Sequence, residues 1–206
     1  MKTIIIKDKL YNYAPVDFYY GRKLIDKKIS KNNLLDFKTI MDTYELSFGI
    51  IFGTLLGAIR ENDFISHDED TDVFILDEDR ETFLMLLFKL REKGFEVARY
   101  ESDLLSLIRD QEYIDIYFFR KCIFRRKCLN YSYPARWFAA FTKVNFLGTY
   151  FNSVKKHELF LKNVYGTNWK IPEKYFHAPA NTMIIKIKSL LPKWLKEKIK
   201  RFIGRV

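Results

Sequence analysis

The strongest constraint in the sequence is a cluster of four carboxylates immediately before an apolar run. Its members, all within five positions, are Asp68, Glu69, Asp70 and Asp72. Negative charges this close together repel one another, and moving each out of water costs several kcal/mol unless a cation compensates for it. Because residues 73–76 are Val, Phe, Ile and Leu, the cluster has to lie against a buried strand. The fold therefore has to bring positive charge to this point.

Asp70 and Asp72 are separated by one residue at the start of a predicted strand over residues 72–76. Side chains alternate between the two faces of a strand, so these carboxylates share a face while Thr71 and Val73 point into the packing. Two carboxylates on one face predict a divalent-cation site, and hard oxygen ligands beside a phosphate-bearing substrate favour Mg²⁺ or Mn²⁺. The alternative is a turn whose acids cap the next element.

Asp115 is the candidate for a third carboxylate, which a site for two metal ions usually takes from a neighbouring strand. It is the one acid among apolar β-forming residues in YIDIYFF, residues 113–119, where an unpaired charge is expensive. The alternative is an edge-strand residue that faces solvent. Asp68 and Glu69 are expected farther from the metal or in solvent.

A glycine–threonine pair, Gly53 and Thr54, follows a predicted strand over residues 47–53 and precedes a short helix-like segment over residues 55–59. Glycine lets a backbone approach a phosphate closely, and a threonine hydroxyl at a helix N-terminus can bind phosphate oxygens. Such a pair alone usually marks only a turn. Followed by the acid-x-acid strand and by a distant acid on a third strand, it resembles the pattern of the nucleotidyltransferase superfamily.

The rest of the chain alternates between helical and strand-like patterns. Helices are predicted over residues 31–46, 80–94 and 155–166, with Asn32 or Asn33 as the cap of the first. Strands are predicted over residues 95–101, 104–110, 113–119 and 143–152, with a tight hairpin at Gln111 and Glu112. Without internal repeats or flexible linkers, these elements predict an α+β domain, a small mixed sheet flanked by helices.

The net charge of +10 comes from two local patches. Residues 182–206 contain eight Lys or Arg and one acid, and residues 120–136 contain six Lys or Arg and no acid. The remainder of the chain is slightly acidic. The chain is therefore not a basic domain, and no nucleic acid is expected among its partners.

Cys122 and Cys128 are expected to be ordinary thiols in a reducing cytosol, because they lack a CxxC spacing and a nearby His. The first residues, MKTIIIKDKLYNY, contain only three consecutive apolar residues, too few for the core of a signal peptide. No stretch reaches the ~18 apolar residues of a spanning helix. The chemistry is therefore expected in the cytoplasm.

Residues 179–206 form a predicted tail, distinct from a catalytic domain over residues 1–178. Its apolar residues recur at helical spacing, and basic residues flank them. The apolar positions are Leu190, Leu191, Trp194, Leu195, Ile199, Phe202, Ile203 and Val206, and the flanking ones are Lys193, Lys196, Lys200 and Arg201. A basic amphipathic helix with a tryptophan is typical of helices that lie on anionic membrane surfaces. The alternative is a helix that packs on the domain's own core or on a partner chain.

Three stretches resemble one family. GTLLGAIRENDFISHDEDTDVFI, residues 53–75, closely resembles the LicD/fukutin-related family, which has a GTLLGxxR stretch, a phenylalanine–isoleucine pair and an acid-rich strand start ending in D-x-D. YIDIYFF resembles the family's later aspartate strand, and YGTNWKIP, residues 165–172, its tyrosine–glycine–tryptophan–proline segment. The resemblance extends over residues 33–173. The departures from the family pattern are Asp63, Ser66, His67 and Glu69, and they leave the three aspartates in place.

This resemblance implies a nucleotidyltransferase-like fold and transfer of a phosphorylated alcohol from a CDP-activated donor to a glycan hydroxyl, with release of CMP. The alcohol would be choline, ribitol, glycerol or a similar one, and the acceptor a cell-surface glycan such as lipopolysaccharide, capsule or teichoic acid. Mg²⁺ or Mn²⁺ held by Asp70, Asp72 and Asp115 would neutralise the diphosphate and lower the pKa of the acceptor hydroxyl. Asp115 could also accept the hydroxyl proton as general base.

Four further residues receive roles from the same resemblance. Gly53 and Thr54 are expected to bind phosphate, and Arg60 to make a bidentate contact to it, with a solvated helix arginine as the alternative. His67 is expected to be structural or exposed, with a substrate contact or a role in acid–base chemistry as the alternative.

Two other classes of function stay open. One is a nucleotidyltransferase that attaches a whole nucleoside monophosphate to a small molecule or protein, because the same metals serve attack at either phosphorus. The other is a catalytically silent membrane-binding module, which the presence of all three acids disfavours. The expected location is cytoplasmic and peripheral on the inner face of the cell membrane, which suits a glycan acceptor built on a lipid carrier.

Deleting residues 189–206 should release the protein from vesicles that contain phosphatidylglycerol, because each nearby Lys or Arg adds up to ~1 kcal/mol of binding at low salt. Turnover of a soluble acceptor should stay nearly intact, since no predicted active-site motif lies beyond Pro172. High salt should weaken binding of the intact protein without abolishing it, because burial of the apolar face is not screened. Co-sedimentation and a turnover assay measure these effects. A truncated protein that precipitates would mean that the helix packs on the domain's own core.

Overall fold

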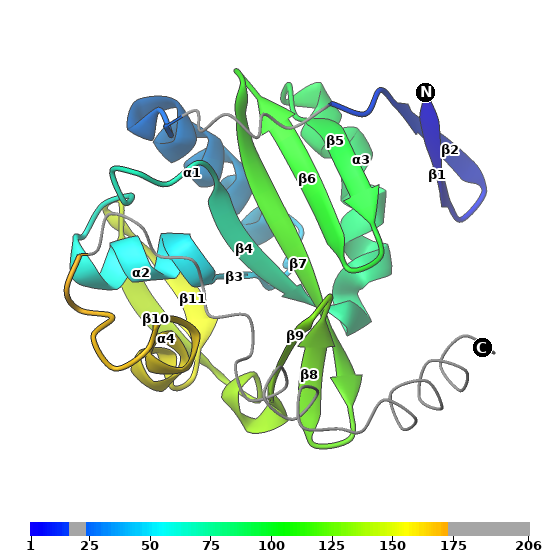
Figure 1. The fold of residues 1–206 in the computed structure, drawn as a ribbon. Helices are drawn as coiled ribbons and strands as arrows, with labels where there is room; N and C mark the ends of the chain where they lie inside the picture. The colour runs from blue at the N-terminus through cyan, green and yellow to red at the C-terminus, as the bar shows by residue number, and fades with distance from the viewer. Residues whose placement is uncertain (17–23, 173–206) are drawn as a thin grey trace, which may run out of the picture. The chain divides into compact units, whose positions relative to one another are not determined.

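Figure 1 shows a computed structural model of the chain, which describes residues 1–16 and 24–172. Within residues 1–161 its main feature is a mixed sheet of nine strands. The main path of the sheet runs β10 (Phe141–Phe146), β11 (Thr149–Val154), β3 (Gly49–Ile50), β4 (Thr71–Leu76), β7 (Glu112–Cys122), β6 (Leu104–Arg109) and β5 (Glu96–Glu101). The pairs β4–β7 and β11–β3 are parallel, and the other pairs on the path are antiparallel. The predicted α+β class is confirmed.

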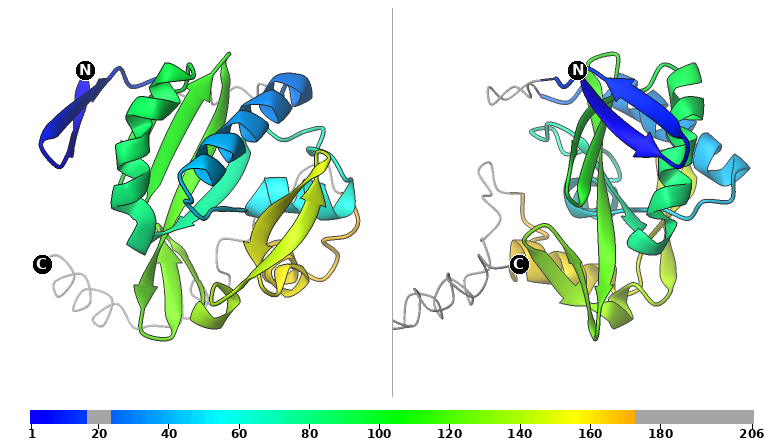
Figure 2. Two further views of the ribbon diagram at one scale, coloured as in Figure 1. Left: turned by 180° about the vertical axis from the view of Figure 1, so that it is seen from behind. Right: turned by 90° about the vertical axis from the view of Figure 1, so that its right-hand side faces the viewer.

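Two helices cover one face of this sheet. They are α1 (Lys27–Thr43) and α3 (Arg80–Glu92), which the rear view in Figure 2 shows lying across the strands. The Phe83 ring of α3 lies 6.2 Å from the Phe37 ring of α1 and 5.7 Å from the Phe118 ring of β7, between centroids. Side chains alternate between the two faces along β7, and Phe118 faces the helices. Asp115, three positions earlier, therefore lies on the opposite face.

The helix α1 begins four residues earlier than predicted, because Asp26 caps it instead of Asn32 or Asn33. The Asp26 carboxylate accepts hydrogen bonds from two backbone N–H groups of the first turn, each at 3.0 Å. Asn33 is buried within the helix, where its side-chain amide donates to the carbonyl oxygen of Arg109 at 2.9 Å.

The predicted strand over residues 47–53 is wrong beyond Ile50. The strand β3 contains only two residues, and α2 (Phe52–Arg60) begins immediately afterwards, so Gly53 lies in the first turn of a helix. The backbone N–H of Ile51 donates to the carbonyl oxygen of Asp72 at 3.2 Å, and Phe52 has a φ of +44°. The chain therefore turns out of the sheet at the point where β4 begins.

Two hairpins also differ from prediction. The turn between β6 and β7 lies at Asp110 and Gln111, with φ of +52° and +64°, one residue earlier than predicted. The predicted strand over residues 143–152 is two strands, β10 and β11, joined at Leu147 and Gly148 with φ of +57° and +86°. In a two-residue hairpin, two consecutive residues with positive φ match the twist of the flanking strands. Both turns have this conformation, although Gly148 is the one glycine among their four residues.

Two segments without a sequence prediction also form hairpins. The strands β1 (Lys2–Ile6) and β2 (Lys9–Tyr13) make a separate two-stranded sheet. β7 pairs at its far end with β8 (Arg125–Cys128), which pairs with β9 (Tyr131–Pro134). Cys122 and Cys128 are both free thiols.

A fourth helix, α4 (His157–Tyr165), occupies most of the predicted helix over residues 155–166, and Gly166 follows it with a φ of +86°. The predicted C-terminal helix and the predicted boundary after residue 178 lie outside the described residues. Among the residues that the structure describes, no helix combines the length and apolar character needed to cross a membrane.

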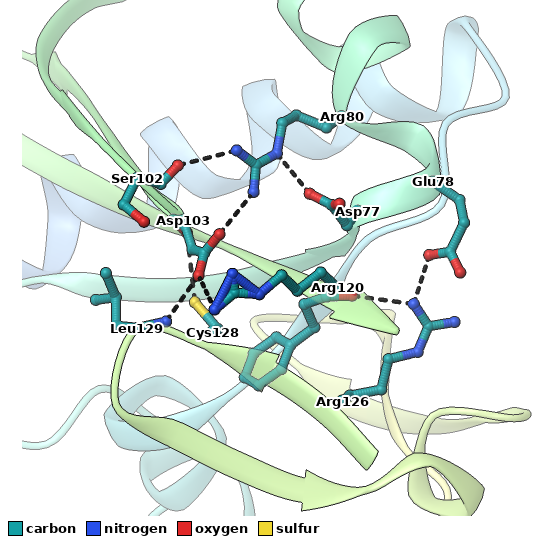
Figure 3. Close-up of polar contacts among 10 residues, drawn as sticks. Asp77, Glu78, Arg80, Ser102, Asp103, Arg120, Arg126, Cys128 and Leu129 are labelled. Atoms are coloured by element: carbon teal, nitrogen blue, oxygen red, sulfur yellow. Dashed lines mark hydrogen bonds and ion pairs between the residues drawn. The ribbon is translucent and has the colours of Figure 1, made fainter. Parts of the chain in front are cut away.

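One buried carboxylate joins several of these elements (Figure 3). Asp103, 3% exposed, lies in the turn between β5 and β6. Its carboxylate lies 3.0 Å from Nη2 of Arg80 on α3 and 3.3 Å from Nη2 of Arg120 on β7, and it accepts the backbone N–H of Leu129 at 3.0 Å. Its carbonyl oxygen accepts the backbone N–H of Phe118 at 2.9 Å. Asp103 therefore connects α3, β7 and the turn between β8 and β9.

Replacing Asp103 with Asn should lower the free energy of unfolding by about 3 kcal/mol, because loss of one partner of a buried ion pair leaves its arginines without a counter-ion. Urea denaturation measures the change. The matched control is Glu78→Gln, which removes the ion pair between Arg126 and a half-exposed carboxylate. That change should cost less than about 1 kcal/mol. Equal losses in the two variants would contradict the connecting role of Asp103.

Candidate active site

The candidate site is a row of polar side chains that crosses four strands on the face opposite α1 and α3, the face seen in Figure 1. Strand register places Asp72 of β4 beside Asp115 of β7, and Ser106 of β6 on the other side of Asp115. Arg99 of β5 is in turn beside Ser106. Because residues paired across neighbouring strands point to the same face, the four side chains form one line.

Asp72 also anchors the N-terminus of α2. The backbone N–H of Gly53 donates to Oδ2 of Asp72 at 2.8 Å, and the backbone N–H of Asp72 donates to Oγ1 of Thr54 at 2.7 Å. A carboxylate is favourable there because the first N–H groups of a helix lack internal acceptors and the helix dipole is positive at this end. The glycine–threonine pair and the acid-x-acid strand are therefore one hydrogen-bonded unit. Phosphate binding by Gly53 and Thr54 stays a prediction.

Gly53 has a steric reason to be glycine. A Cβ atom at this position would lie 2.4 Å from Oδ2 of Asp68 and 3.1 Å from Oδ2 of Asp72. A side chain would therefore displace the Asp68 carboxylate from the start of α2. Asp68, which the sequence places farther from the site, lies directly against this turn.

Asp115 is held by two partners that the sequence does not reveal. It is 4% exposed, and β7 lies between β4 and β6, so the edge-strand alternative is wrong. Oγ of Ser106 donates to Oδ1 of Asp115, and Nη2 of Arg99 lies 3.1 Å from Oδ2. A cation and a hydroxyl thus fix the orientation of this carboxylate.

Burial and neighbouring negative charges determine the pKa values of the carboxylates in this site. Burial raises the pKa of Asp70 and of Asp72 well above the ordinary value, and the neighbouring carboxylates raise it further. Burial likewise raises the pKa of Asp68, to about 6. Burial raises the pKa of Asp115 as well, while Ser106 and Arg99 oppose that rise. The protein alone therefore leaves the negative charge of this cluster only partly compensated, which is the chemistry of a cation-binding site.

Hard carboxylate oxygens of Asp68, Asp70 and Asp72 have the chemistry to hold Mg²⁺ or Mn²⁺. Within residues 1–16 and 24–172, however, no three His, Cys, Asp or Glu side chains are already spaced to enclose a metal ion. The oxygens of Asp115 are held by Arg99 and Ser106. Metal binding by Asp70, Asp72 and Asp115 together stays a prediction that would need some of these side chains to reorient.

Arg60 and His67 lie on α2 and on the loop that follows it, not on the strands that carry the row of polar side chains. Arg60 is the last residue of α2, about two helical turns from Gly53, and its Nη2 lies 2.6 Å from Oε1 of Glu61. Its charge still lowers the pKa of Asp68. The side chain of His67 is exposed in the loop between α2 and β4, and a substrate contact by this residue stays a prediction.

An aromatic wall borders the carboxylates. The Tyr117 side chain hydrogen-bonds to Asp72 and so lowers the pKa of that carboxyl, opposing the effect of burial. The Phe52 ring lies 5.0 Å from the Tyr117 ring and 4.8 Å from the Tyr131 ring of β9, between centroids. The wall combines residues from three separate segments, so the sequence does not reveal it as a unit. The one available signal is Tyr117, which lies two residues after Asp115 and so shares its face of the strand.

The Asp68→Asn variant should change how stability depends on pH in metal-free buffer. A pKa of about 6 in the folded protein, above the ordinary 3.8, means that the folded state binds more protons than the unfolded state between these values. This contribution to stability is complete below pH 3.8 and is lost as the pH rises through 6. The free energy of unfolding, from urea titrations with EDTA, should therefore fall less from pH 5 to pH 7 in the variant than in the wild type.

The control for this measurement is Asp8→Asn, which removes the same charge from the turn between β1 and β2. Because Asp8 is exposed, this variant reports the effect of losing a surface charge alone. A parallel pH dependence for Asp68→Asn and the wild type would show that Asp68 is not desolvated in the folded protein.

Comparison with known proteins gives a family match over most of the chain. A family model described as the LicD/FKTN/FKRP nucleotidyltransferase domain matches residues 45–183. An uncharacterized protein of Rickettsia typhi is 32% identical over 101 residues, which are 46% of this chain and 32% of that protein. The lipopolysaccharide cholinephosphotransferase LicD of Haemophilus influenzae is 32% identical over 71 residues, 34% of this chain and 27% of that enzyme. The chain thus aligns with about a third or less of each relative.

Solved structures of the antibiotic-resistance factor ANT(2'')-Ia resemble the fold. The solution structure has a TM-score of 0.52 and 13% identity, over 87% of this chain and 94% of that one. The crystal structure with adenylyl-2''-tobramycin has a TM-score of 0.50 and 14% identity, over 86% of this chain and 98% of that one. These likenesses show a nucleotidyltransferase-like fold. The family match, which includes Gly53, Thr54 and all three aspartates, shows that the chain belongs to the LicD family.

Proposed function

We propose that the protein transfers a phosphorylated alcohol from a CDP-activated donor to a hydroxyl group of a cell-surface glycan and releases CMP. The observation that carries this proposal is the set of carboxylates, Asp68, Asp70, Asp72 and Asp115, gathered at the N-terminus of α2 in a LicD-family domain. The Haemophilus relative is named a lipopolysaccharide cholinephosphotransferase, so phosphocholine is the first group to test.

Asp70 and Asp72, with Asp115 after reorientation, would hold the divalent cation of this reaction. A bound Mg²⁺ or Mn²⁺ supplies neutralisation of the donor's diphosphate and a lower pKa for the acceptor hydroxyl. The raised pKa values of Asp70 and Asp72 support this role, because a site whose charge is balanced by the protein alone would not show them.

Asp115 is the candidate general base. In the transfer, the acceptor oxygen bonds to the phosphorus that carries the alcohol, and the bond between this phosphorus and the bridging oxygen breaks, so CMP leaves with the electron pair. The acceptor proton passes to Asp115. Arg99 and Ser106 support this role, because both oppose the rise in the pKa of Asp115 that burial causes and so favour the ionised form that can accept a proton.

The phosphate contacts of the donor would come from Gly53 and Thr54. Both groups now bind Asp72, so a donor phosphate would have to share or replace these hydrogen bonds. Arg60, the last residue of α2, would make a bidentate contact to the donor phosphate. His67, an exposed loop residue, would be available for a substrate contact.

The remaining partners follow from this proposal. The acceptor would be a glycan, including one linked to a lipid carrier, and the enzyme would work in the cytoplasm, peripheral to the inner face of the membrane. Residues 179–206 would provide binding to anionic lipid. No nucleic acid is proposed as a partner.

Incubation with Mg²⁺, CDP-choline, CDP-ribitol, CDP-glycerol and nucleoside triphosphates should release CMP from one CDP-linked donor in the presence of a glycan acceptor. Asp70→Asn and Asp72→Asn should abolish release while the protein stays folded, because Asn keeps the volume and loses the charge. Asp115→Asn should lower the maximal rate by at least ~10² while the protein stays folded. Product chromatography and thermal unfolding measure these effects.

Three results would contradict the proposal. Release of pyrophosphate from a nucleoside triphosphate would indicate transfer of a whole nucleoside monophosphate to a small molecule or protein. Activity within tenfold of wild type in both Asp70→Asn and Asp72→Asn would remove the metal assignment. If Asp115→Asn is fully active, another residue supplies the third carboxylate, and Glu112 and Asp110 are the next candidates in the sequence.

A further inference from the structure

The turn between β7 and β8 exposes two large apolar side chains. Ile123 is 79% exposed and Phe124 is 85% exposed, although the segment on either side is hydrogen-bonded in register. Together they form the outermost point of a two-residue hairpin turn, here named the apolar tip. Single exposed apolar residues are ordinary, but two adjacent ones at the end of a hairpin are a hydrophobic surface without a partner in the described chain.

Turn geometry does not explain these residues. Two-residue hairpin turns favour Asn or Gly, because at least one central residue has positive φ. Ile123 has a φ of +48°, a conformation that is unfavourable for a β-branched side chain. The tip therefore combines residues that are unfavourable both for the backbone and for contact with water, and such strain is typically kept for a functional reason.

Positive charge surrounds the apolar tip. The segment from residue 120 to residue 136 has six Lys or Arg and no acid. Lys121 and Arg125, which flank the tip on its two strands, are both exposed. Farther from the tip, Arg120 pairs with Asp103 and Arg126 with Glu78, so these cations stabilise the hairpin. Arg125 donates hydrogen bonds to Oγ of Ser132 at 2.7 Å and to the carbonyl oxygen of the same residue at 2.5 Å, and no acid pairs with it among the residues of this hairpin.

We propose that the apolar tip, Ile123 and Phe124, docks the protein on an anionic lipid surface. Apolar side chains that enter the acyl boundary, with cations at the level of the headgroup phosphates, are the two components of interfacial binding. A protein partner fits less well, because a stable protein interface buries roughly 800 Å² on each side and two side chains offer far less. This surface lies within the described residues and is independent of the tail over residues 179–206 and of the transfer reaction.

The first test is binding of the full-length chain to vesicles of phosphatidylcholine and phosphatidylglycerol. The double variant Ile123→Asn, Phe124→Gly places favoured turn residues at the tip, so its melting temperature should be equal to or higher than that of the wild type. Its affinity for the vesicles should be at least tenfold lower. The matched control is Ile5→Ser, Leu10→Ser, which removes two exposed apolar side chains paired across the hairpin of β1 and β2 and should leave the affinity unchanged.

The second test follows the tip itself. The Phe124→Trp variant should show tryptophan quenching by brominated lipid beyond that of the wild type, whose own tryptophans give the baseline. This readout reports insertion of the tip even when the rest of the chain also binds the vesicle.

Each of three results would overturn the proposal. The first is no additional quenching in Phe124→Trp. The second is an equal loss of affinity in the tip variant and in the control. The third is a dimeric wild type that becomes monomeric in the tip variant, which would make a second copy of the chain the occupant. Catalytic activity enters none of these measurements, so their outcome is separate from that of the proposed transfer reaction.

Discussion

The contact between Asp72 and the first turn of α2 is the interaction on which the site depends. It fixes the start of a helix, through Gly53 and Thr54, to the start of a strand in the centre of the sheet. The parallel register of β4 and β7 then places Asp115 beside Asp72. A shift of one residue in this register would turn Asp115 to the face covered by α1 and α3, so packing of that face also determines the geometry of the site.

Buried carboxylates are stabilised differently in two parts of this domain, at Asp103 and beside α2. Asp103 is contacted by two arginines and a backbone N–H, and these contacts connect α3, β7 and the turn between β8 and β9. The carboxylates beside α2 have fewer partners, and burial together with mutual repulsion raises the pKa of Asp70 and Asp72. Removing one of these charges would relieve the repulsion and stabilise the protein. The same uncompensated negative charge attracts a cation. The site therefore carries a cost in stability that the Asp103 cluster does not.

The sequence predicts most of what is local. The α+β class, the acid-x-acid strand and the glycine–threonine pair follow from alternation and spacing within single segments. The partners of Asp115 do not, because Arg99 and Ser106 reach it only through the pairing of β5, β6 and β7, and no pattern within one strand contains that register. The start of α2 was missed for the same reason: a residue 19 positions later, Asp72, caps it.

The strand β7 carries Asp115 near its beginning and ends beside the apolar tip. Ile123 lies eight positions after Asp115, and at about 3.3 Å for each residue of a strand the two lie up to roughly 26 Å apart. β7 is paired with β4 and β6 near Asp115 and with β8 from Arg120 to Cys122, so it is a stiff spacer. If the tip rests at the headgroups, β7 sets an upper limit to the height of the carboxylates above the membrane. Acceptor hydroxyls within that height would be in reach, and the spacer would then discriminate among glycans by how far they extend from the lipid.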